Sequence, residues 1–91
     1  MTSALPRYRT LQLCAAGGGF EAFPESARRL DLGSLRRRLE GEGRSVIDAR
    51  VMLIVSGTPE MTISAAGRVL IKTPDRSVAE QAFAGILPLL S

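Results

Sequence analysis

Hydrophobic and polar positions alternate at the start of the chain, between residues 8 and 13. Leu11 and Leu13 lie on one face of this segment, whereas Thr10 and Gln12 lie on the other, so the pattern predicts a half-buried strand. The glycine run at 17–19 ends the strand in a flexible loop, because three glycines in a row are costly to order. A short extended piece over 20–24 is expected next.

Leucines at helical spacing follow at residues 31–43. Asp31 is expected to cap the helix N-terminus with its side chain. Three leucines then form an apolar stripe, the pattern of a helix with one buried face. These are Leu32, Leu35 and Leu39. Gly41 and Gly43 end the helix.

The middle of the chain, residues 45–71, is read as three consecutive strands. The first covers 45–55 with a bend expected at 48–50, and the third covers 69–71. In the second, Met61 and Ile63 alternate with polar residues. Because short turns join the three segments, we expect an antiparallel meander.

A second helix is expected at the C-terminal end. Ser77 and Glu80 have the spacing of a capping box, which predicts Ser77 as N-cap. One apolar face recurs along the helix with helical spacing. Its members are Ala79, Ala82, Phe83, Ile86, Leu87 and Leu90. Pro88 weakens the final turn.

The element order predicts an α+β fold, β-α-β-β-β-α, with a curved antiparallel sheet and two helices on one face. A chain of 91 residues is long enough for one core, so we expect a single domain over 1–91. Residues 1–7 form a loose N-terminus, and 8–90 form the folded core.

The second face of this sheet has no helix left to cover it. If Leu53 and Val55 point to the helices, then Met52 and Ile54 point away, as two apolar side chains on a polar face. Such residues favour a contact surface. Two occupants stay open: a second copy, paired through a sheet edge in an isologous dimer, or the chain's own N-terminal segment together with the 20–24 loop.

Composition narrows the chemistry. The chain has no histidine and one cysteine, Cys14. Without histidine, the usual general base near neutral pH and the commonest metal ligand are missing. We therefore expect no enzyme, no catalytic residues, no metal and no cofactor. Cys14 stays open as a reactive thiol, but a small packed thiol is the favoured interpretation.

Charge gives a weaker signal. The formal net charge is +3, which permits contact with nucleic acid but does not require it. Arg36 and Arg37 on the first helix are candidates for partner binding, with a solvated helix face as the alternative.

The first ten residues lack the apolar region of a signal peptide and no apolar run approaches a membrane span, so a cytoplasmic protein without membrane contact is expected.

Several short motifs follow one another along the chain: Leu13-Cys14, Phe20-Glu21-Ala22, Pro24, Arg29-Leu30-Asp31-Leu32, Arg38-Leu39, Val55-x-Gly57, Glu60-Met61-Thr62, Gly67-Arg68, Ile71-Lys72-Thr73, Phe83 and Ile86. In order and spacing they resemble the C-terminal domain that follows the adenylation core in some ThiF/MoeB-type, E1-like sulfur-carrier adenylyltransferases. The chain departs from that family at Ala15-Ala16 and at 64–66, and it has neither the glycine-rich ATP loop nor the Cys-x-x-Cys pair of the adenylation core. The resemblance implies a non-catalytic accessory module that binds an adenylyltransferase core, a ubiquitin-like sulfur carrier or a second copy.

A second resemblance rests on Leu30-Asp31-Leu32, on residues 63–68 and on the element order. In these features the chain resembles half of a TATA-box-binding protein. It implies the same fold and, as the alternative function, a nucleic-acid-binding module. The phenylalanine that wedges into DNA in that family falls near Ser64, so kinking of the minor groove is not expected.

Overall fold

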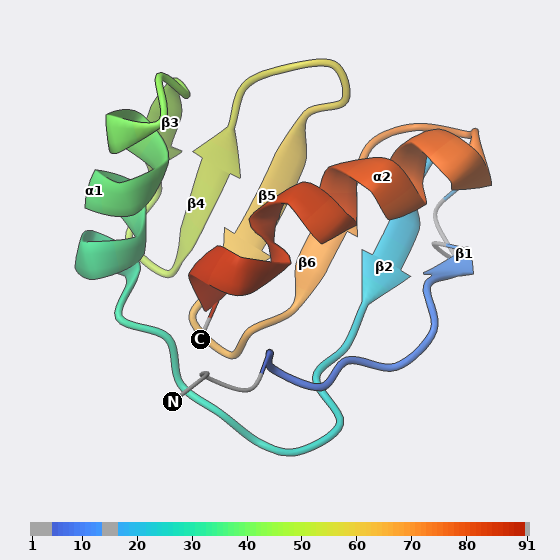
Figure 1. Ribbon diagram of the computed structural model, residues 1–91, viewed down its shortest axis with the longest axis horizontal. Coiled ribbons are helices and arrows are strands. Elements are labelled where there is room, and N and C mark those ends of the chain that lie inside the picture. The colour runs from blue at the N-terminus through green and yellow to red at the C-terminus, as the bar shows by residue number, and fades with distance from the viewer. Residues whose placement is uncertain (1–4, 14–16, 91) are drawn as a thin grey trace.

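The computed structural model describes residues 5–13 and 17–90, so Cys14 lies outside the described residues. Six antiparallel strands form one sheet in the order β1-β2-β6-β5-β4-β3, and two α-helices accompany it (Figure 1). The strands are β1 (Gln12–Leu13), β2 (Phe20–Ala22), β3 (Val46–Asp48), β4 (Met52–Val55), β5 (Met61–Ser64) and β6 (Val69–Ile71). The helices are α1 (Leu32–Gly41), α2 (Arg76–Ile86) and the short 3-10 helix η1 (Leu87–Leu90).

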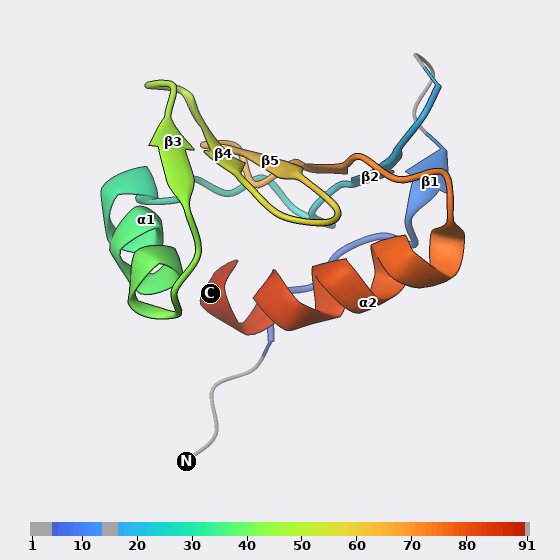
Figure 2. The same ribbon diagram turned by 90° about the horizontal axis from the view of Figure 1, so that it is seen from above.

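The two α-helices lie on the same side of the sheet (Figure 2). Side chains that point to this side form the core, and they are the buried members of the four inner strands β2, β4, β5 and β6. The strands supply Leu53, Val55, Ile63, Val69 and Ile71, and the helices supply Leu35, Leu39, Ala79 and Ile86. The predicted α+β class with an antiparallel sheet is confirmed. The number of strands is larger than predicted.

The first difference lies before α1, where the strand predicted over 8–13 is present only as the two-residue β1, and the extended piece predicted over 20–24 contains a further strand, β2. β2 occupies the place in the sheet next to β6, with Phe20 opposite Ile71. β1 pairs outside β2, at the edge of the sheet. Phe20 is buried and can cover the core, whereas Leu13 is 71% exposed and does not line it as predicted.

The second difference lies in 45–55, which forms a hairpin of two strands. Arg50 has a φ of 73°, a left-handed conformation that reverses the chain at the predicted bend. The Asp48 carboxylate accepts a hydrogen bond from the Arg50 backbone N–H at 2.8 Å and supports this turn. The bend is thus a complete turn, and Val51, which was predicted within the strand over 45–55, lies just after the turn and is 65% exposed.

The N-cap residue was predicted correctly for α1 and wrongly for α2. Asp31 caps α1, because its side chain accepts from the Ser34 backbone N–H. For α2 the N-cap is Asp75, not Ser77, and its carboxylate accepts from the backbone N–H groups of Ser77 and Val78. A carboxylate beside the positive end of the helix is a stronger acceptor than the serine hydroxyl. Pro88 lies in η1, where the α-helical hydrogen bonding has ended.

Among the described residues, no helix has both the length and the apolar character that crossing a membrane requires.

Candidate functional site

The face of the sheet opposite the helices carries a groove that follows β5. Its floor is formed by the short side chains of Thr62 and Ser64. Its walls are longer side chains on the two neighbouring strands: Met52 and Ile54 on β4, and Arg68, Leu70 and Lys72 on or beside β6. The hollow has a volume of about 370 Å³. Short residues between rows of long ones therefore shape this surface.

Strand register explains why the walls face each other. Thr62 lies opposite Ile54 on β4 and opposite Leu70 on β6. Residues that pair across neighbouring antiparallel strands point to the same side of the sheet. The row continues outward to Ile47 on β3 and to Glu21 on β2. An apolar strip thus runs across the open face and ends in a carboxylate.

Arg68 is held at one end of the β6 wall by two contacts. Its Nη2 donates to the Glu21 carboxylate in an ion pair. Its guanidinium carbon also lies 5.4 Å from the centroid of the Phe23 ring, a cation–π contact. The Arg68 side chain remains 54% exposed, whereas that of Glu21 is only 10% exposed. The cation, rather than the carboxylate, is therefore presented to solvent.

Lys72 marks the other end of the same wall. Its Nζ lies 2.9 Å from the Glu60 carboxylate, and its side chain is 55% exposed. An ammonium group has three N–H donors and Glu60 takes one of them. Leu70 lies between Lys72 and Arg68 on the same side of β6, so this wall presents a cation, an apolar side chain and a second cation.

Met52 and Ile54 lie where the sequence predicted them, on the face away from the helices. The predicted alternative, in which the N-terminal segment and the 20–24 loop cover them, was wrong for the described residues. Residues 20–22 are part of the sheet as β2. The N-terminal segment runs on the helix side (Figure 2). There the Tyr8 ring contacts the Phe83 ring of α2 at a centroid distance of 5.1 Å. Thr10, predicted on the open face, lines a hollow beside α2.

The structure does not bring the two candidate arginines into this groove. Arg36 lies on α1, where it is 3.2 Å from the Glu40 carboxylate and 3.8 Å from that of Asp48. Arg37 is exposed on the same helix. α1 covers the other face of the sheet (Figure 2), so these arginines and the pair formed by Met52 and Ile54 do not form one site.

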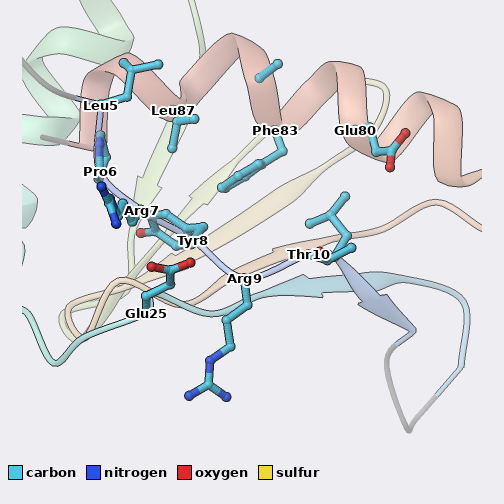
Figure 3. Close-up of a pocket in the computed structure, with 12 residues that line it drawn as sticks. Leu5, Pro6, Arg7, Tyr8, Arg9, Thr10, Glu25, Glu80, Phe83 and Leu87 are labelled. Carbon is cyan, nitrogen blue, oxygen red and sulfur yellow. The ribbon is translucent and has the colours of Figure 1, made fainter.

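A second hollow, of about 520 Å³, lies between the N-terminal segment and α2 (Figure 3). Tyr8 lies in it, but its hydroxyl donates to the Gly67 carbonyl at 2.5 Å and is already used. Burial raises the pKa of Tyr8, and the nearby Arg28 charge partly offsets this effect. Arg9 is directed away from α2 in Figure 3. Because the phenol is protonated at neutral pH and engaged with the backbone, it is poorly suited to act as a base.

Metal chemistry finds no support in the part of the chain that the structure describes. Within residues 5–13 and 17–90, no group of three or more histidine, cysteine, aspartate or glutamate side chains could hold a metal ion. The carboxylates at the groove, Glu21 and Glu60, each form an ion pair with a cation. The arrangement is suited to contact with another molecule through apolar and cationic side chains.

Sequence reasoning missed the β6 wall and its two carboxylate partners. The signal for Leu70 was present, because it lies between two core residues, Val69 and Ile71, and must point the opposite way. Arg68 and Lys72 share that direction, two residues to either side. Glu21 and Glu60 carried no such signal, since their ion pairs depend on strand pairing that the sequence does not state.

Comparison of the chain with protein-family models, with curated proteins and with solved structures gives no match.

Proposed function

We propose that this chain is a non-catalytic module that binds a partner protein through the groove on the open face of its sheet. The observation that carries the proposal is the group of three apolar side chains in the groove, Met52, Ile54 and Leu70, which no described helix covers. An apolar centre with a charged rim is the usual composition of a protein interface. The charged side chains at the rim, Arg68 and Lys72, are held in ion pairs and leave the apolar side chains of the groove accessible.

The proposed partner belongs to sulfur-carrier activation: an E1-like adenylyltransferase core or its ubiquitin-like carrier. This part rests on the resemblance to the C-terminal domain of ThiF/MoeB-type enzymes. Several motifs that carry the resemblance supply side chains to the groove or its rim. Their contributions are Glu21, Glu60, Thr62, Arg68 and Lys72. Short motifs far apart in the sequence thus gather at one surface, as expected if that surface has the shared role.

Titration calorimetry with a purified adenylyltransferase core and a purified carrier tests the proposal. We expect one of the two to bind, and we expect Ile54→Glu to weaken binding at least about 10-fold, because a charge would be buried in an apolar contact. Val78→Glu is the matched control, since Val78 is an apolar residue of α2 that is 36% exposed on the other side. Binding that is equally weakened by both variants, or absent for both partners, would contradict the proposal.

A nucleic-acid-binding module, related in fold to half of a TATA-box-binding protein, is the second candidate. The exposed cations Arg68 and Lys72 on an open antiparallel sheet favour it. The modest formal net charge of +3 counts against it, because nucleic-acid binding draws mainly on long-range attraction to many phosphates. Fluorescence anisotropy with duplex DNA at two salt concentrations decides: tight, strongly salt-dependent binding lost in Lys72→Gln would favour this function over the first.

The proposed module has no catalytic activity of its own. We expect the purified chain neither to hydrolyse ATP nor to adenylate a carrier, because its groove is lined by apolar and paired charged groups. Pyrophosphate release that survives repeated purification and follows the protein through every column would overturn this part of the proposal.

A further inference from the structure

We infer that the groove accepts one amphipathic helix of the partner, with an apolar ridge along β5 and an acidic flank along the β6 wall. This inference rests on the proposed function and adds the chemistry of the partner. Three observations carry it: the backbone groups at the floor are already paired, the groove has the width of a helix ridge, and its one charged wall is cationic.

The first observation concerns backbone hydrogen bonds. β5 pairs with β4 on one side and with β6 on the other, so its N–H and C=O groups are used in the sheet. An extended peptide laid over this face would bury its own backbone groups without partners, at a high free-energy cost. A helix satisfies its backbone internally. A helix is therefore the favoured occupant of the groove.

The second observation concerns width and depth. The two walls stand on β4 and β6, which flank β5 and so lie about 9.6 Å apart, twice the spacing of neighbouring strands. A whole helix, about 10–12 Å across with its side chains, does not sink into such a groove. One row of its side chains does fit, because Thr62 and Ser64 leave room between Ile54 and Leu70. The contact is a ridge of side chains packed into a groove.

The third observation concerns charge. Arg68 and Lys72 are four residues apart, about 13 Å along an extended strand. Each is about half exposed, and each has N–H donors beyond the one that its carboxylate partner takes. Acidic residues seven or eight positions apart lie along one flank of a helix at a spacing of about 10.5–12 Å, which long side chains can extend to match. A helix with carboxylates at this spacing matches both cations.

The partner is a different chain rather than a second copy. The apolar stripes of both helices are buried in the core of their own chain, through Leu35 and Leu39 in α1 and Ala79 and Ile86 in α2. A copy therefore has no free amphipathic helix to offer within its described residues. Two open faces placed against each other would also leave their two hollows facing, with few contacts between the floors.

The test uses two synthetic helical peptides of about 15 residues, a length at which helices begin to be stable. They share a leucine ridge and differ in one flank, which carries glutamate in the first and lysine in the second. Anisotropy of the labelled peptides gives the affinities. We expect the glutamate peptide to bind the wild-type chain at least about 5-fold more tightly, as two partly exposed ion pairs would allow.

Lys72→Glu should reverse this preference, and Lys72→Gln should reduce it. Arg37→Glu is the control, because it changes the net charge equally at an exposed position on the other side of the sheet. Equal affinity of the two peptides for the wild type, no binding of either, or an equal effect of Arg37→Glu would overturn the inference. Light scattering completes the test: a wild-type dimer that Ile54→Glu dissociates would place a second copy in the groove instead.

Failure here is separable from failure of the proposed function. If the adenylyltransferase core or the carrier binds and Ile54→Glu prevents it, while the peptides show no charge preference, the docking surface stands and only the acidic helix is wrong. If neither protein binds, the proposed function itself fails.

Discussion

The two faces of the sheet are built from the same strands but differ in how completely they are covered. On the helix face, Leu53 and Ile63 are fully buried. On the open face their sequence neighbours Ile54 and Thr62 are only partly buried. The first set contributes to folding because α1 and α2 cover it. The second set stays partly exposed in the isolated chain, so its apolar side chains have surface left to bury in a complex.

If the two faces have separate roles, β4 contributes to both of them. Its four residues alternate between the faces, so stability and binding are carried by adjacent positions. Substitutions one residue apart should therefore have effects of different kinds.

The largest effect is expected from Leu53→Ala compared with Ile54→Ala. Removing the fully buried Leu53 side chain leaves a cavity in the core and should lower the free energy of unfolding by about 3 kcal/mol. The same truncation at Ile54 should cost less, about 1 kcal/mol, because its side chain is only partly buried and its removal leaves no enclosed cavity. Urea denaturation of both variants measures the contrast, and similar losses would show that the open face also supports the fold.

A smaller effect is expected at the start of α2, the helix that covers β6. Asp75→Ala removes the side chain that accepts from two backbone N–H groups and should cost about 1 kcal/mol. Ser77→Ala, at the position that the sequence favoured as the cap, should change stability by less than about 0.5 kcal/mol. Thermal unfolding of the two variants distinguishes them; a larger loss for Ser77→Ala would place the cap there.

The smallest effect concerns Tyr8, which joins the N-terminal segment to the helix layer. Burial raises the pKa of Tyr8 in the folded chain, so the unfolded chain releases this proton first, near pH 10.0. The stability from the protonated phenol is therefore complete below that pH and is lost as pH rises through the folded pKa. Absorbance near 295 nm reports it directly, because Tyr8 is the single tyrosine and the chain has no tryptophan.

Phe83→Ala sharpens this experiment, since it removes the ring that packs against Tyr8. The ionisation midpoint should move toward the ordinary value for tyrosine, because water then reaches the phenol. A native midpoint at or below pH 10 would contradict the packing of Tyr8 under α2.

The sequence predicted the helix face well for physical reasons. Leucines at helical spacing identified α1, and alternation identified Met61 and Ile63 as inward residues of β5, because burial imposes a period on the sequence. Alternation also placed Met52 and Ile54 on the open face. The same alternation also predicts Leu70 on the open face, because Leu70 lies between the two inward residues Val69 and Ile71.

Pairing between distant segments set the limit of prediction. Nothing local distinguishes 20–22 from 8–13 as the neighbour of β6, since both are short and both contain apolar residues. The ion pair of Glu21 with Arg68 depends on that choice and joins residues 47 positions apart. The turn at Arg50 was predicted as a bend only, because a non-glycine residue with positive φ has no strong sequence signal.

The central claim is that the open face of the sheet is the docking surface, and methyl NMR of the isoleucines and methionines tests it most directly. Ile54 and Met52 report on the open face, whereas Ile63 and Ile71 report on the helix face of the same sheet. On titration with the partner that calorimetry identifies, we predict that the Ile54 and Met52 methyl signals shift and that those of Ile63 and Ile71 stay nearly constant. Shifts centred on Ile86 of α2, with Ile54 and Met52 unchanged, would contradict the account.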